Sequence, residues 1–213
     1  MRHVVIVGGG AALAQPLIRR FLITGCKVTA MCRRTDPRVG GCDVVALTGG
    51  VKDNVDVLVT LTGSTADVKI KDMNKFQWQD VIDSCLTAPA QAMTEMFLKM
   101  KPGGNVVVVG SVVGSTGAYG AANYAAAKAG LVGLVRSAAL EWASRDIKVN
   151  LLELGFIDAG MGARLDPKVK ERVLPTIPLR RFGTEEDFVH AVEFLATTKY
   201  ATGTALTLAG GLR

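Results

Sequence analysis

The sequence has few of the residues that build metal centres or disulfide frameworks. Only two histidines, His3 and His190, occur in 213 residues. The four cysteines are scattered and form no Cys-x-x-Cys pair: Cys26, Cys32, Cys42 and Cys85. Structural zinc sites and disulfide scaffolds depend on closely spaced or paired cysteines. We therefore expect neither a metal site nor a disulfide framework.

Long hydrophobic runs and targeting segments are also missing. No apolar run reaches the roughly 18 residues that a membrane-spanning helix needs. Residues 1–8 read as a core strand that runs into a turn, without the small-residue cleavage site of a secretory signal. These features predict a cytoplasmic protein with no membrane segment.

The chain has no basic stripe, although its formal net charge is +6. Its basic residues are dispersed, and aromatic residues, which would interleave with them in many nucleic-acid surfaces, make up only 6% of the chain. We therefore expect no nucleic-acid partner. A phosphorylated cofactor and an acidic protein partner both account for the excess of positive charge.

Repeats, low-complexity tracts and linkers are absent as well, so we expect a single domain over residues 1–213. Nearly half of the residues, 49%, are hydrophobic, and there are 24 glycines. This composition is typical of a doubly wound α/β fold, in which buried parallel strands alternate with helices through tight turns.

One segment in the middle of the chain carries a recognisable chemistry. Val106–Val109 is a β-branched run typical of a buried parallel strand, and Ser111 follows its carboxyl end. Ligands of open α/β sheets bind at that edge. Tyr124 lies thirteen residues after the serine, and Lys128 four residues after the tyrosine, about one helical turn. An isolated Tyr-x-x-x-Lys pair is usually a solvated helix face, but the preceding strand and serine favour a catalytic site.

The three side chains fit the protonation of a carbonyl oxygen. A phenol loses its proton near pH 10 in water, and a neighbouring cation favours the phenolate. Lys128 is therefore expected to lower the pKa of Tyr124. Ser111 would hold the carbonyl oxygen while negative charge develops on it.

Strand, serine, glycine loop, Tyr-x-x-x-Lys helix and a further strand together resemble the short-chain dehydrogenase/reductase family. The segment from Gly110 to Ile157 is most similar to the β-ketoacyl-(acyl carrier protein) reductases. The resemblance implies a Rossmann-like, three-layer, doubly wound parallel sheet. It also implies NADP(H)-dependent reduction of a 3-oxoacyl thioester in fatty acid or polyketide biosynthesis, with catalytic residues Ser111, Tyr124 and Lys128. Tyr124 and Lys128 would contact the cofactor too.

The cofactor half of the chain departs from that family. Val4–Val7 runs into a glycine turn that could hold a pyrophosphate at a helix N-terminus. The family has further glycines where this chain has Ala12 and Ala14. A tight βα turn without a ligand is the alternative interpretation. The residues of the turn expected to bind the cofactor are Gly8, Gly9, Gly10, Ala11 and Leu13.

The next elements concern the adenosine end of the cofactor. Arg33 follows the strand Lys27–Met31, where an arginine suits the 2′-phosphate of NADP. The resemblance assigns the adenine side to Asp43 and Val44, whereas an alternative strand, 44–47, would shift that register. Because residues 33–56 are glycine-rich and short, we expect one or two crossover helices to be missing there.

Other positions complete the expected site. The resemblance assigns cofactor contacts to Gly63, Gly155 and Ile157, although Leu61, Leu154 and Ala159 depart from the family pattern. Cys85 stands where the family has an asparagine that holds a water in the proton relay. We expect Cys85 to be a small buried thiol; a nucleophile is the alternative, but no histidine partner is evident.

The resemblance also implies partners. Arg145 matches a position that faces an acidic carrier protein, with Lys99 and Lys101 on a nearby loop; an exposed helix-end charge is the alternative. The terminal strand, 205–211, commonly lies at a subunit contact, so we expect a homo- or hetero-oligomer, a dimer or tetramer. The rival function is a catalytically impaired subunit that completes a hetero-oligomer with an active reductase.

Overall fold

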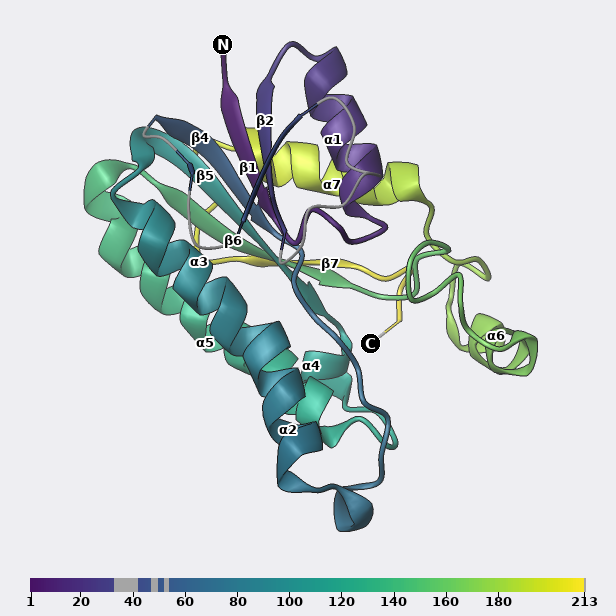
Figure 1. Cartoon of the computed structure of the whole chain (residues 1–213). Coiled ribbons are helices and arrows are strands. Elements are labelled where there is room, and N and C mark those ends of the chain that lie inside the picture. Colours follow the sequence, from purple (N-terminus) through teal and green to yellow (C-terminus); the bar gives the residue numbers. More distant parts are fainter. Residues whose placement is uncertain (33–41, 47–49, 52–53, 213) are drawn as a thin grey trace.

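A seven-stranded parallel sheet forms the centre of the molecule. The computed structural model describes residues 1–32, 42–46, 50–51 and 54–212. The strands lie in the order β3-β2-β1-β4-β5-β6-β7, with the direction of winding reversed between β1 and β4 (Figure 1). The strands are β1 His3–Val7, β2 Lys27–Cys32, β3 Asp43–Ala46, β4 Val55–Thr60, β5 Met100–Ser111, β6 Lys148–Leu154 and β7 Ala205–Leu208. This arrangement confirms the predicted Rossmann-like fold.

Helices cover both faces of the sheet, giving the three predicted layers (Figure 1). α1 (Ala14–Ile23) and α7 (Glu185–Thr197) contact each other on one face, and α3 (Ala88–Phe97) and α5 (Ala122–Trp142) cover the other. The remaining helices are α2 Lys75–Ile82, the π-helical turn Asp83–Thr87, α4 Val113–Thr116, α6 Pro167–Val173 and the short 3-10 turns Ile70–Asp72, Ala143–Arg145 and Leu174–Thr176. In the part of the chain that is described, no helix is long and apolar enough to cross a membrane.

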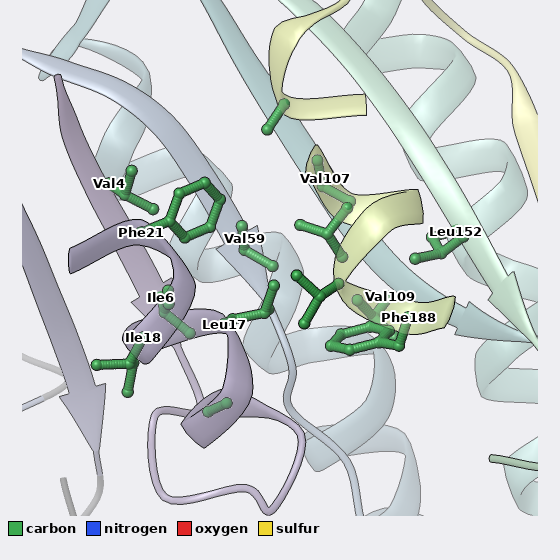
Figure 2. Packing of buried hydrophobic residues seen from close by; sticks show 14 of the residues in the cluster. Val4, Ile6, Leu17, Ile18, Phe21, Val59, Val107, Val109, Leu152 and Phe188 are labelled. Carbon is green, nitrogen blue, oxygen red and sulfur yellow. The ribbon is translucent and has the colours of Figure 1, made fainter. Parts of the chain in front are cut away.

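The strands are apolar on both sides because helices bury both. On one face, Leu17 and Phe21 of α1 and Phe188 of α7 pack against strand valines (Figure 2). Side chains at alternate positions of the same strands, such as Val106 and Val108, pack against α3 and α5. The predicted strand Val106–Val109 is almost completely buried, which confirms its place at the centre of a parallel sheet.

The connections around β3 are shortened, as the sequence predicts. Ten residues, 33–42, join β2 to β3, and eight, 47–54, join β3 to β4. The described residues of these connections include no helix. Val51 instead packs into the core cluster that contains Met31, and Val45 lies against it. A single buried valine therefore occupies part of the space that a crossover helix would fill.

The last helix begins with a capping box at Thr184. The hydroxyl of Thr184 accepts a hydrogen bond from the Asp187 N–H at 3.1 Å, and the Asp187 carboxylate accepts one from the Thr184 N–H at 2.8 Å. Arg181 also donates to this carboxylate at 2.7 Å. The hydrogen bonds from Arg181 and from the Thr184 N–H hold the pKa of Asp187 well below its usual range.

Asp187→Ala is expected to lower the free energy of unfolding by about 1 kcal/mol at pH 7, because it removes half of the capping box. The folded state depresses the pKa of Asp187, so its stabilisation is present above the unfolded pKa of about 3.9 and is lost as the pH falls further. Urea unfolding at pH 7 and pH 3 measures both effects. Glu186→Ala, one residue away and outside the box, is the control; an equal loss in both variants would contradict the assignment.

Candidate functional site

Ser111, Tyr124 and Lys128 meet at the carboxyl edge of the sheet. Ser111 is the last residue of β5, and Tyr124 and Lys128 lie in the first two turns of α5. The Ser111 hydroxyl accepts a hydrogen bond from the Val113 N–H at 3.3 Å and lies close enough to the Tyr124 phenol to lower its pKa. The Lys128 ammonium lies 5.6 Å from the centre of the Tyr124 ring and donates to the Val109 carbonyl at 3.0 Å. The structure therefore brings together the three residues that the sequence proposed.

The electrostatics of the tyrosine differ from the expectation. Burial raises the pKa of Tyr124 to about 12, with a further increase from the neighbouring Cys85 and a partial offset from the Ser111 hydrogen bond. The expected lowering by Lys128 is wrong for this structure. The ammonium faces a backbone carbonyl, and burial lowers the pKa of Lys128 itself. Tyr124 is thus a protonated donor at neutral pH.

The glycine turn after β1 presents unpaired donors at the start of α1. The N–H groups of Gly10, Ala12 and Leu13 have no hydrogen-bond partner among the described residues, whereas the Ala11 N–H is bonded to Gly8. Free N–H groups at a helix N-terminus form an anion site. These donors fit a pyrophosphate, so the turn retains the features of a dinucleotide site.

The two alanines that replace family glycines have different surroundings. The methyl group of Ala14 is fully buried in the core beneath α1, so it does not obstruct the turn. Ala12 is exposed, and a Cβ placed on Gly160 would lie 3.3 Å from its methyl group. Only Ala12 therefore lies where its methyl group borders the candidate cofactor space.

Gly8 packs the glycine turn closely against the chain that follows β4. Its φ of +88° is a left-handed conformation, and a Cβ there would lie 2.9 Å from the backbone of Leu61. Gly8→Ala is expected to lose about 2–3 kcal/mol of unfolding free energy and to weaken NADPH binding. Gly25→Ala is the matched control: its φ is +77° with nothing within 4 Å, so it should lose only about 1 kcal/mol and leave binding unchanged. Equal losses in urea unfolding and in calorimetry would contradict the role of Gly8.

A pocket of about 630 Å³ lies beside the catalytic edge. Val112, which directly follows Ser111, belongs to one wall of the pocket, and the chain after β7 forms the opposite wall. The lining residues are Val112, Ser115, Thr116, Thr207, Ala209, Gly210, Gly211 and Leu212. The pocket offers space for a substrate beside the end of the strand that carries Ser111. The sequence did not reveal it, because its two walls come from segments about ninety residues apart.

Comparisons with known proteins agree with this geometry. The family model described as Enoyl-(Acyl carrier protein) reductase matches residues 42–213. The chain is 32% identical over 241 aligned positions to a 3-oxoacyl-(acyl carrier protein) reductase of Chlamydia pneumoniae, covering 99% of this chain and 96% of that protein. The chain belongs to the short-chain dehydrogenase/reductase family. It is close to the 3-oxoacyl-(acyl carrier protein) reductases within that family.

Two further similarities define the extent of the match. The chain is 42% identical over 164 residues to the corresponding reductase of Staphylococcus aureus strain Mu50, an alignment that covers 75% of this chain but only 66% of that protein. A solved short-chain dehydrogenase/reductase of Serratia marcescens BCRC 10948 superposes with a TM-score of 0.88 at 22% identity, covering 99% of this chain and 97% of that one. The latter supports the fold alone.

Cys85 lies beside Lys128, at the position of the asparagine expected from this family. Its thiol is fully buried in the π-helical turn and donates to the Ser64 carbonyl at 3.2 Å. A Cβ on Gly63 would lie 3.2 Å from the Cys85 sulfur and 3.7 Å from the Lys128 nitrogen. The thiol therefore anchors the loop after β4 against the lysine. Both histidines, His3 and His190, have their contacts elsewhere.

A pair of serines supports the same loop and was missed from the sequence. The hydroxyls of Ser64 and Ser84 lie 2.7 Å apart, and Ser84 also lies 3.6 Å from the Cys85 sulfur. A π-helical turn, which places Ser84 and Cys85 here, is frequent at functional sites. No local signal in the sequence indicates that turn, because it depends on the packing of α2 and α3 around it.

The expected nicotinamide-side residues lie close to the candidate site. Ile157 is buried and forms an isolated parallel bridge with Gly183, next to the segment that reaches Ala12. Gly155 directly follows β6 and abuts Ala209; a Cβ there would lie 2.8 Å from that residue. Both positions are compatible with the expected contacts.

The expected adenine-side residues do not all reach this edge. Asp43 begins β3 opposite Thr29, and its carboxylate pairs with Lys27 at 3.4 Å. Val44, the next residue, lies opposite Ala30 within the strand. The carboxyl end of β3 is Ala46, so the register does not place Asp43 at the cofactor edge. Arg33 lies outside the described residues.

The Arg145 side chain makes its contacts within this chain. Its guanidinium donates to the backbone carbonyls of Phe97 and Met100 and lies 4.9 Å from the centre of the Phe97 ring. Met100 begins β5, whereas Ser111 ends it. Arg145 therefore joins the end of α3 to the amino end of β5, at the sheet edge opposite the candidate site.

Among the described residues, no group of three or more His, Cys, Asp or Glu could hold a metal ion.

Proposed function

We propose that the chain is an NADP(H)-dependent oxidoreductase that reduces a 3-oxoacyl thioester, or a related ketone, to the hydroxy product. The observation that carries this proposal is that Ser111 and protonated Tyr124 lie together beside the buried Lys128. The N–H groups of the glycine turn that have no partner among the described residues fit the pyrophosphate of a dinucleotide. The related reductases from Chlamydia pneumoniae and Staphylococcus aureus add support.

Ser111, Tyr124 and Lys128 have different roles in the reduction of the carbonyl group. Bound NADPH would supply a hydride to the keto carbon. Ser111 donates a hydrogen bond to the keto oxygen and positions it, and Tyr124 transfers its phenolic proton to that oxygen as charge develops. Lys128 would hold the nicotinamide ribose of the bound cofactor through its ammonium group, which lies 5.6 Å from the centre of the Tyr124 ring. Lys128 is buried and Ser111 and Tyr124 are partly buried, so each interaction is stronger than in water.

The preference for NADPH over NADH rests on Arg33, which follows β2, the strand beside the glycine turn. An arginine after this strand pairs with the 2′-phosphate that only NADPH carries. The proposed enzyme uses one domain, residues 1–213, and assembles as a dimer or tetramer. Its cofactor contacts are those of the glycine turn, Gly63, Gly155 and Ile157, with Tyr124 and Lys128 on the nicotinamide side.

Calorimetric titration of the isolated protein with NADPH and with NADH tests this proposal. We expect saturable NADPH binding, and at least tenfold weaker binding of NADH. If the titration showed no heat of binding up to millimolar NADPH, the proposal that the chain is an enzyme would be wrong. Equal affinity for both cofactors would overturn the role of Arg33 only, and Arg33→Ala with NADPH would check that result.

The second candidate is an impaired subunit that completes a hetero-oligomer with an active reductase. Two observations favour it: the Ala12 methyl group beside the candidate cofactor space, and Cys85 in place of the asparagine. The intact contacts of Ser111, Tyr124 and Lys128 speak against it. A subunit of this kind would bind no NADPH alone and would form tetramers only after an active reductase is added. Analytical ultracentrifugation with and without that partner measures this.

A further inference from the structure

The segment between β6 and α7 concentrates positive charge. Residues 158–182 carry six cationic and three anionic side chains, a net charge of +3, which is half of the +6 of the whole chain. The anions are Asp158, Asp166 and Glu171, and the cations are Arg164, Lys168, Lys170, Arg172, Arg180 and Arg181. α6 lies within this segment and extends away from the sheet at one end of the molecule (Figure 1).

Three of these cations have no partner among the described residues. Lys170 pairs with Asp158 at 2.9 Å, Arg181 pairs with Asp187, and Arg180 donates to a backbone carbonyl. The side chains of Arg164, Lys168 and Arg172 are exposed and make no hydrogen bond or ion pair with the described residues. We call these three residues the α6 patch. Lys168 and Arg172 are four positions apart in α6 and therefore share one helix face.

The segment 158–182, which carries the α6 patch, contacts the surroundings of the candidate site on both sides of α6. On the amino side, Gly160 lies against Ala12 of the cofactor turn. On the carboxyl side, the Leu179 N–H donates to the Gly210 carbonyl at 3.0 Å, and Gly210 lines the pocket beside Ser111. The chain that leaves α6 therefore reaches a wall of that pocket.

Exposed apolar side chains accompany the charges. Met161 is 55% exposed and Leu179 is 63% exposed, one on each side of α6. Cations surrounding a few exposed apolar side chains suit a protein surface with carboxylates, since charges guide encounter and apolar groups contribute contact area. The residue expected to bind such a partner, Arg145, is committed to backbone carbonyls at the opposite sheet edge.

We propose that the α6 patch is the docking surface for an acidic carrier protein that delivers the acyl group as a thioester. This inference rests on the proposed function, because it assumes that the acyl group enters the pocket beside Ser111. The positive charge of Arg164, Lys168 and Arg172 attracts the acidic surface, and the thioester arm reaches past Leu179 into the pocket. Docking at this place requires no contribution from Arg145.

The double variant K168E/R172E tests the proposal with two substrates that carry the same acetoacetyl group. One is an acidic bacterial acyl carrier protein loaded with acetoacetyl, and the other is the acetoacetyl thioester of N-acetylcysteamine. We expect kcat/KM for the carrier-bound substrate to fall at least tenfold, mainly through KM, and its dependence on salt to weaken. The kcat/KM for the small thioester and the NADPH affinity should change less than twofold. R136E/K199E, with the same change of charge on exposed residues elsewhere, should leave both substrates unaffected.

An unchanged kcat/KM for the carrier-bound substrate in K168E/R172E would overturn the proposal, and so would equal losses for the two substrates. Binding of the loaded carrier protein, followed by fluorescence anisotropy, separates docking from catalysis. If the wild type turned over neither substrate but bound the carrier, and K168E/R172E bound it at least tenfold more weakly, docking would stand and the proposed reaction would fail. Absence of carrier binding to the wild type would overturn the docking surface.

Discussion

Tyr124→Phe is expected to lower kcat for reduction of a 3-oxoacyl thioester by about 10²- to 10⁴-fold, the range that a positioned general acid contributes. The change removes the phenolic proton and the interaction of the hydroxyl with Ser111, but it keeps the aromatic ring. NADPH affinity and the thermal midpoint should therefore change little. Steady-state kinetics and calorimetry on the same preparation measure these quantities.

Tyr119→Phe is the matched control for this result. Tyr119 lies five residues before Tyr124, but its side chain is 87% exposed. The control should retain full activity. If Tyr124→Phe kept more than a tenth of the wild-type kcat, the assignment of the proton donor would be wrong.

Lys128→Met is expected to lower kcat by about 10²- to 10³-fold, comparable to the removal of one preorganised donor from an anionic transition state. The ammonium that would hold the cofactor beside Tyr124 is lost, while the length of the side chain is retained. The alkaline limit of kcat should move as well. In the wild type it follows Lys128, whose pKa burial lowers from its ordinary value of 10.5, and in the variant it follows Tyr124, with a pKa of about 12.

The same substitution has an expected signature in stability. Because the folded state lowers the pKa of Lys128, the unfolded chain binds more protons between that lowered pKa and about 10.4. Wild-type stability should therefore gain a rising contribution with pH across this window, and Lys128→Met should lack it. Urea unfolding from pH 7 to pH 10 measures the difference. Identical pH dependence in both proteins would show that Lys128 is not buried as described.

The sequence predicted the parts of the site that one strand–helix unit carries. Val106–Val109 reads as a buried strand by itself, and the spacing of Ser111, Tyr124 and Lys128 follows from that strand and the next helix. Helical periodicity and the position of strand ends are local properties, so they are visible without the rest of the fold. The shortened connections around β3 were evident for a similar reason, since chain length alone excludes full crossover helices.

Predictions from the sequence were wrong where several elements of the fold together determine the position or the pKa of a residue. The pKa of Tyr124 depends first on its burial, and the Lys128 ammonium faces a backbone carbonyl instead of the phenol. The position of Asp43 depends on the pairing register of β3 with β2, which the alternating pattern of a four-residue strand leaves open. The guanidinium of Arg145 is held by carbonyls more than forty residues away in the sequence.

The cofactor half is less disturbed than the glycine replacements suggested. Ala14 contributes to the core, and the N–H groups of Gly10, Ala12 and Leu13 remain free among the described residues to bind an anion. These contacts favour a working reductase over a subunit that has lost its site.

Transfer of deuterium from 4S-deuterated NADPH to an acetoacetyl thioester tests the central claim most directly. The isolated protein is incubated with both compounds, and the product is analysed by mass spectrometry, with 4R-deuterated NADPH in a parallel reaction. We expect a 3-hydroxybutanoyl thioester with one deuterium on the carbinol carbon from one of the two cofactors, and almost none from Tyr124→Phe. Absence of the hydroxy product, or a product unlabelled by either cofactor, would contradict hydride transfer by this chain.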